Sequence, residues 1–188
     1  MLSLGEMETT MKSLATLFLC MLMVSAAGSP HALAQTGQSP EARLKELNIM
    51  LPAVPPPVAN YVDSVRSGNL LFLAGNTADA DWKYKGKLGR DITVDQGYET
   101  ARRVGLIMLA KVRAAVGSLD KVKRIVKVLG MVNSADGFGD QPRVINGFSD
   151  LMVDVFGEAK GKHARSAVGM AGLPFDHAVE VEMIVEVE

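Results

Sequence analysis

The chain has 188 residues and a formal net charge of −1, with 20 basic and 21 acidic side chains. This balance speaks against a protein that binds polyanions, because such proteins carry an excess of Lys and Arg. Cys20 is the single cysteine, so the chain cannot form an internal disulfide.

The N-terminal segment has the pattern of a secretory signal peptide. Lys12 stands in a short basic region, residues 14–27 form an apolar run, and Ala32-Leu33-Ala34 is a small-residue cleavage motif. The apolar run is short for a membrane span. An uncleaved anchor is the alternative interpretation.

We therefore expect residues 1–34 to be removed between Ala34 and Gln35, with Met11 as an alternative start. The expected product is an exported, periplasmic protein without a membrane segment. Cleavage removes one lysine and two glutamates, which leaves 19 of the 20 basic and 19 of the 21 acidic side chains. The mature chain is then close to neutral.

Residues 35–58 read as an N-terminal extension and linker ahead of a domain over 59–188. Residues 41–47 have the spacing of a short amphipathic helix. Pro55-Pro56-Pro57 cannot donate hydrogen bonds to a sheet and favours an extended linker.

The domain is predicted to follow the order β-β-α-β-α-β-β. Ser67-Gly68-Asn69 predicts a tight hairpin, and Thr93 with Gln96 forms a capping box before a long helix that Gly117 ends. The expected strands and helices are 61–66, 70–74, 93–116 (helix), 125–133, 142–156 (helix), 165–171 and 178–188. This order indicates an α/β domain with a single mixed sheet and both helices on one face.

The last strand alternates between two kinds of side chain. One set is Val179, Val181, Met183, Val185 and Val187, and the other is Glu180, Glu182, Ile184, Glu186 and Glu188. The strand therefore has an apolar face and an acidic face. Since two helices cover only one sheet face, we expect a closed oligomer to cover the other.

Residues 79–92 are polar and contain Trp82 and Tyr84, which predicts a long loop. Long loops in compact domains are often functional or interfacial. The sequence contains no phosphate-binding loop and no dinucleotide fingerprint.

Arg165 and Glu180 are the residues most suited to chemistry. Arg165 opens an apolar strand, where its planar guanidinium would bind a carboxylate through two hydrogen bonds or form a structural salt bridge. Glu180 would act as a general base or hold a water. Alternatively, it would belong to a row of solvated acidic side chains that includes Glu182. Both glutamates lie on the same face of the predicted strand, so alternation does not show which of them has a role. If the two strands are neighbours, a cation and a carboxylate face one pocket.

Other polar residues give weaker patterns. Tyr61 would donate a phenolic hydrogen bond to a substrate or pack at a strand start. His163 and His177 lack the spacing of a metal site, and we expect no metal. Ser166 has neither a His/Asp signature nearby nor the flanking glycines of a nucleophile elbow.

Several segments together resemble the Rid/YjgF family, the reactive-intermediate deaminases once described as L-PSP endoribonucleases. The segments are YVDSVRSGNLLFLAG from Tyr61 to Gly75, Asn146, Ala164-Arg165-Ser166, Leu173-Pro174 and VEVE from Val179 to Glu182. The resemblance extends over residues 61–188 and is to the larger branch of the family, about 150 residues long.

This resemblance implies a chorismate-mutase-like fold and a homotrimer with sites between subunits. It implies that Arg165 binds the carboxylate of a small 2-imino acid and that Glu180 positions the water that releases ammonia. Tyr61, Gly75 and Asn146 match positions that line the cleft. The family uses no cofactor, so none is expected, and no nucleic acid partner is expected.

The chain also departs from the family pattern. Ala167 stands where the family often has cysteine, Ala59-Asn60 replaces a Gly-Pro pair, and the loop 79–92 is longer. The resemblance nevertheless implies a hydrolase of the 2-iminobutanoate/2-iminopropanoate deaminase type, and the departures leave open whether this chain is an enzyme. The alternatives are a non-catalytic protein that binds small carboxylates or 2-oxo acids and, less favoured, an endoribonuclease.

Overall fold

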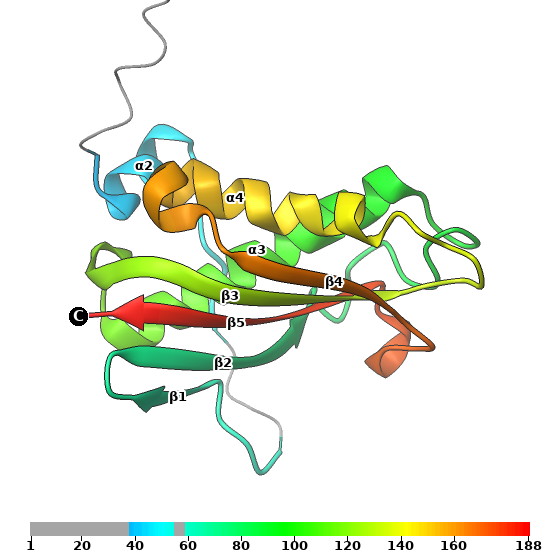
Figure 1. The fold of residues 1–188 in the computed structure, drawn as a ribbon, viewed down its shortest axis with the longest axis horizontal. Helices are drawn as coiled ribbons and strands as arrows, with labels where there is room; N and C mark the ends of the chain where they lie inside the picture. The colour runs from blue at the N-terminus through cyan, green and yellow to red at the C-terminus, as the bar shows by residue number, and fades with distance from the viewer. Residues whose placement is uncertain (1–37, 55–58) are drawn as a thin grey trace, which may run out of the picture. The chain divides into compact units, whose positions relative to one another are not determined.

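In the computed structural model, which describes residues 38–54 and 59–188, a five-stranded sheet lies beneath a layer of helices (Figure 1). The predicted signal peptide and Pro55-Pro56-Pro57 lie outside the described residues. The elements are α2 (Pro40–Glu46), β1 (Ser64–Ser67), β2 (Leu70–Thr77), α3 (Val94–Val116), η1 (Leu119–Lys121), β3 (Val122–Asn133), α4 (Gln141–Gly161), β4 (Ala164–Met170), η2 (Pro174–Asp176) and β5 (Val179–Val187).

The strand order in the sheet is β1-β2-β5-β3-β4. β3 and β4 are parallel, and the other neighbouring pairs are antiparallel. The predicted mixed sheet with both long helices on one face is confirmed, as is the inner position of β3. β5, the last strand in the sequence, lies in the middle of the sheet, between β2 and β3.

The start and end of α3 follow directly from the sequence. Thr93 accepts a hydrogen bond from the Gln96 backbone, and the Gln96 side chain accepts one from the Thr93 backbone, which is the predicted capping box. Gly117 ends the helix in the left-handed region, with φ 87°. A residue with a Cβ would be strained in this conformation.

The predicted hairpin is present, but β1 is shorter than expected. Gly68, with φ 60°, and Asn69 form the two-residue turn between paired Ser67 and Leu70. β1 begins at Ser64, because the ladder with β2 ends at the Ser64–Leu73 pair. Tyr61 thus precedes the strand.

Helix α4 continues one turn beyond the predicted end at Phe156. Gly157 adopts φ 72° and ψ 169°, which interrupts the helix without ending it. Only glycine reaches this conformation readily. The final turn, which ends at Gly161, therefore leaves the main axis of α4 and leads directly into β4.

The predicted helix at residues 41–47 is α2, and it packs against the rest of the domain. Leu44 is 2% exposed. Glu41 binds the Arg113 guanidinium, with 2.7 Å between Oε2 and Nη2, and accepts a hydrogen bond from the Leu119 backbone at 3.0 Å. These contacts fix α2 to the C-terminal end of α3.

The two faces of the sheet differ sharply. The alternating apolar side chains of β5 are almost fully buried beneath the helices, as predicted: Val179, Val181, Met183, Val185 and Val187. On the other face, one row of paired residues crosses all five strands: Val65, Phe72, Ile184, Lys127 and Ala164.

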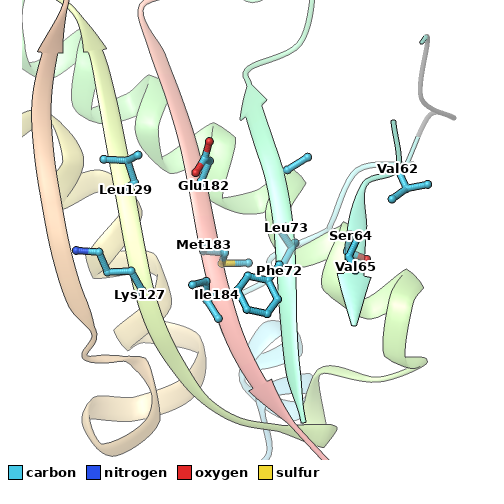
Figure 2. Close-up of a pocket in the computed structure, with 11 residues that line it drawn as sticks. Val62, Ser64, Val65, Phe72, Leu73, Lys127, Leu129, Glu182, Met183 and Ile184 are labelled. Carbon is cyan, nitrogen blue, oxygen red and sulfur yellow. The ribbon is translucent and has the colours of Figure 1, made fainter. Parts of the chain in front are cut away.

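This second face, which we call the open face, is partly apolar. Figure 2 shows Phe72 of β2 beside Ile184 of β5, with Leu129 of β3 on the same side. Val65 is 58% exposed and Phe72 41%. No described helix covers these side chains, so this face of the domain is an exposed, partly apolar surface.

Within residues 38–54 and 59–188, no helix has both the length and the apolar character needed to span a membrane.

Candidate functional site

Arg165 lies on the helix-covered side of the edge strand β4. It is paired with Val128, a fully buried residue beneath the helices. Its Nη1 donates to Asn146 Oδ1 at 2.9 Å and to Ser149 Oγ at 3.0 Å, and its Nη2 donates to the Pro142 carbonyl at 3.3 Å. The first turns of α4 therefore fix the guanidinium in one orientation.

This arrangement leaves part of the guanidinium for a ligand. A guanidinium has five N–H donors, and the three hydrogen bonds above use three of them. Among the described residues Nε has no hydrogen-bond partner. Nε–H and the second Nη2–H remain, and two guanidinium N–H groups form the fork that binds a carboxylate in bidentate fashion.

Asn146, which the resemblance implied to line a cleft, lies beside Arg165. Asn146 and Ser149 are three residues apart in α4, so they share one helix face. Both supply oxygen atoms to the same Arg165 nitrogen. Sequence analysis did not single out Ser149, although its spacing from Asn146 on a helix would have indicated the shared face.

Glu180 lies on the open side of β5, half-buried and close to the backbone of β2. The β2–β5 ladder shifts register between Leu73 and Asn76, which places Gly75 within a bulge. A Cβ on Gly75 would overlap Glu180 Oε1. Glycine at this position thus makes room for the carboxylate, which brings two of the predicted site residues together.

A hollow of about 760 Å³ surrounds Glu180. Tyr61, which is 52% exposed, and Gly75 also line it. Lys111 reaches the hollow from α3 and forms an ion pair with Asp63. Tyr61, Gly75 and Glu180 thus line the same hollow. The other two predicted site residues, Arg165 and Asn146, do not line it.

The structure distinguishes Glu180 from Glu182, which sequence alternation did not. Burial, with a smaller contribution from the neighbouring Glu182 charge, raises the pKa of Glu180 above its ordinary value. Glu182 is exposed. A half-buried carboxyl with a raised pKa is better suited to exchanging protons near neutral pH.

Arg165 and Glu180 project from opposite faces of the sheet. β3 lies between their strands, so the strands are not neighbours. Arg165 contacts α4, whereas Glu180 alternates with Val179 and Val181, which are buried beneath the helices. Within one protomer the two side chains therefore do not share a pocket, and the single-pocket arrangement considered for adjacent strands does not occur.

His177 also lines the hollow around Glu180. It is 3% exposed, and its Nδ1 has no hydrogen-bond partner among the described residues. Burial, together with the nearby Lys85 charge, lowers the pKa of His177. The sequence pattern indicated only that His177 is not a metal ligand, and it did not predict a place beside Glu180, because His177 lies in a short irregular segment before β5.

The loop 79–92 is attached to helix α3 by side-chain contacts. Asp79 forms an ion pair with Arg103 of α3, and Trp82 Nε1 donates to Thr100 Oγ1 at 2.9 Å. Asp79 also lines the hollow around Glu180. The start of the loop thus shapes the rim of the candidate site.

Ala167, which occupies the position where the family often has cysteine, packs against the hydrophobic core. A group of three or more His, Cys, Asp or Glu side chains arranged to hold a metal ion does not occur within residues 38–54 and 59–188.

Comparisons with known proteins identify the family and the fold. Residues 41–187 match the family described as "YjgF/chorismate_mutase-like, putative endoribonuclease". The chain belongs to this family. Protein TCP17 of Trypanosoma cruzi is 46% identical over 147 residues, which are 77% of this chain and 92% of TCP17.

Two solved structures support the same assignment. Atu1372 of Agrobacterium tumefaciens is 43% identical, with a TM-score of 0.72 over 79% of this chain and 92% of that one. A protein of Shewanella oneidensis MR-1 is 29% identical, with a TM-score of 0.74 over 80% of this chain and all of that one. The fold of this YjgF-like chain is therefore that of the family.

Proposed function

We propose that this YjgF-like protein is a homotrimeric hydrolase that converts small 2-imino acids into 2-oxo acids and ammonia. Its site forms where the Arg165 region of one subunit meets the Glu180 hollow of the next. The observation that carries the proposal is the placement of the two groups on opposite faces of one sheet. Two copies of the chain can bring together groups that a single copy separates.

The open face supports a closed assembly. Its exposed apolar side chains include Val65, Phe72 and Val168, and the last of these is 40% exposed. A ring of three copies covers each open face with a neighbour. The same packing places the edge strand β4 of one copy beside the hollow of another.

The chemistry assigned to each group follows from its surroundings. The free Arg165 fork binds the substrate carboxylate and orients the imine carbon. Glu180 accepts a proton from a water as that water adds to the C=N carbon. That proton then passes to the nitrogen, which gives a carbinolamine. The remaining hydroxyl proton transfers through Glu180 to the nitrogen as the C–N bond breaks and the C=O bond forms, so that ammonia leaves and a 2-oxo acid remains.

The test is ammonia release from 2-iminopropanoate formed from short-lived 2-aminoacrylate. The purified protein should release ammonia faster than buffer alone, and Arg165→Ala should lose this activity. A protein that does not exceed the buffer rate with any of several 2-imino acids would overturn the deaminase proposal.

A non-catalytic carboxylate-binding protein is the second candidate, and the preorganised Arg165 fork favours it. The three hydrogen bonds that fix Arg165 do not involve Glu180. Such a protein would melt at a higher temperature in the presence of pyruvate. The shift would require Arg165 and would persist in Glu180→Gln.

An endoribonuclease function is not favoured by the hollow. Its lining includes three carboxylates, and although Asp79 is paired with Arg103, Glu180 and Glu182 are positioned to repel a phosphate backbone. The lysine that lines it, Lys111, is already paired with Asp63.

We also propose that the protein is exported and cleaved between Ala34 and Gln35. The support is the signal-peptide pattern in the sequence. N-terminal sequencing of the protein from a periplasmic fraction should begin at Gln35. An intact N-terminus in the cytoplasmic fraction would contradict export.

A further inference from the structure

Arg165 is the end of a longer chain of hydrogen bonds that runs through Ser149 and His163. Ser149 Oγ lies 3.0 Å from Arg165 Nη1 and 3.1 Å from His163 Nε2. His163 Nδ1 lies 2.7 Å from the Gly161 carbonyl oxygen. The chain thus connects the guanidinium to the backbone at the end of α4.

The direction of each hydrogen bond follows from the last one. A carbonyl oxygen only accepts, so His163 Nδ1 carries a proton. In the neutral imidazole, Nε2 is then an acceptor, and Ser149 must donate its hydroxyl proton to it. The lone pairs of Ser149 Oγ are left to accept from Arg165.

The surroundings keep His163 neutral and in place. Burial lowers the pKa of His163, the hydrogen bond to the Gly161 carbonyl partly opposes this shift, and the nearby Arg165 charge adds to the lowering. The Phe148 ring meets the imidazole edge-on, at 6.4 Å between ring centres. The Gly157 kink allows the last turn of α4 to present the Gly161 carbonyl to the imidazole.

We propose that Ser149 and His163 are positioning residues for the carboxylate clamp at Arg165. The inference rests on the proposed role of Arg165 in binding a carboxylate. His163 fixes the rotation of the Ser149 hydroxyl, and Ser149 then holds one Nη1 proton of Arg165. The free edge of the guanidinium is therefore oriented before a ligand arrives, which reduces the entropy lost on binding.

The first test measures pyruvate affinity by calorimetry for the full-length mature protein and its variants. Ser149→Ala and His163→Leu should each weaken binding about tenfold, because each removes a link in the hydrogen-bond chain to a charged group. His163→Gln should stay within about threefold of the native affinity, since its amide oxygen can accept the Ser149 proton in place of Nε2.

Lys162→Gln is the matched control, because Lys162 is adjacent to His163 but pairs with Glu158 at 2.8 Å. It should leave affinity unchanged. Melting temperatures confirm that each variant is folded. Native affinity in Ser149→Ala, or an equal loss in His163→Gln and His163→Leu, would overturn the inference.

A second test needs no ligand. Nitrogen-15 NMR should show His163 neutral and protonated at Nδ1 at pH 7, with separate Nη signals for a rotationally fixed Arg165. Ser149→Ala should merge those Arg165 signals. A His163 protonated at Nε2, or an Arg165 that stays fixed in Ser149→Ala, would contradict the positioning role.

The two proposals fail separately. The proposed carboxylate site is wrong if the native protein does not bind pyruvate, or if Arg165→Ala binds it as tightly as the native protein. In either case the NMR experiment still decides whether Ser149 holds Arg165. If Arg165 is required but Ser149 and His163 have no effect, only the positioning role is wrong.

Discussion

The Arg165 region and the Glu180 hollow are built in contrasting ways. Hydrogen bonds from α4 hold Arg165, so that its orientation is set within the protomer. Glu180 has space around it, made by Gly75 and the β2 bulge, and burial raises its pKa. One region is thus suited to binding a carboxylate and the other to proton transfer, and the proposed reaction needs both.

The largest expected effect is on the binding region. Arg165→Ala should lower kcat/KM for 2-iminopropanoate by about 10³-fold, since a bidentate pair between charged groups is lost. Arg165→Lys should recover little, because an ammonium cannot form the fork. Steady-state ammonia release measures both variants. Activity in Arg165→Ala within tenfold of the native protein would contradict the clamp.

The proton-transfer region should respond in kcat instead. Glu180→Gln should lower kcat about 100-fold, because the amide cannot accept a proton from water, while pyruvate affinity changes little. Glu182→Gln is the matched control on the same strand face and should retain most of the activity. Equal losses in the two variants would remove the distinction between Glu180 and its exposed neighbour.

A substitution on the open face should disrupt the proposed trimer without changing the Arg165 region or the Glu180 hollow directly. Phe72→Glu places a charge in the middle of this surface and should convert trimers to smaller species in analytical ultracentrifugation. Activity should fall with the assembly. Met50, which is 88% exposed and lies outside the sheet, gives the control Met50→Glu. An intact trimer in Phe72→Glu would show that the open face is not the interface.

A smaller effect is expected from the space beside Glu180. Gly75→Ala introduces a Cβ that overlaps Oε1 and should displace the carboxylate, lowering kcat about tenfold. Gly139→Ala is the control, because nothing lies within 4 Å of a Cβ at that position. Unchanged kcat in Gly75→Ala would mean that the close approach to β2 has no role.

The smallest expected effect concerns stability and pH. The folded pKa of Glu180 is raised, so its protonated form is favoured by folding, and this stabilisation is lost as pH rises through the folded pKa. Near neutral pH, Glu180→Gln should therefore be slightly more stable than the native protein, by under about 1 kcal/mol. Urea unfolding of both proteins at pH 4 and pH 7 measures this difference. A difference in unfolding free energy that is the same at the two pH values would contradict the prediction.

Sequence patterns predicted most of the fold, because a helix cap, a tight turn and an alternating strand each depend on residues that are close together in the chain. The capping box at Thr93, the turn at Gly68 and the alternation of β5 each involve neighbouring residues. The extra turn after Gly157 was missed, because a glycine in that conformation can end a helix or only bend it. The contacts around it decide the outcome.

The candidate site was predicted in part. Resemblance indicated Arg165, Glu180 and Asn146, but strand spacing alone suggested that the first two share a pocket. Their separation depends on β3 lying between β4 and β5, which is a property of the sheet topology. Ser149 and His163 could not be singled out, because their link to Arg165 depends on how α4 packs against the edge strand.

The most direct test of the shared site mixes two inactive variants in one assembly. Arg165→Ala and Glu180→Gln are co-expressed, and trimers containing both are isolated by two different affinity tags. If each site takes Arg165 from one subunit and Glu180 from the next, every isolated mixed trimer has about one intact site in three, whichever variant supplies two of its subunits. We expect the mixed trimers to recover about a third of native ammonia release, and mixed trimers as inactive as either parent would contradict a site shared between subunits.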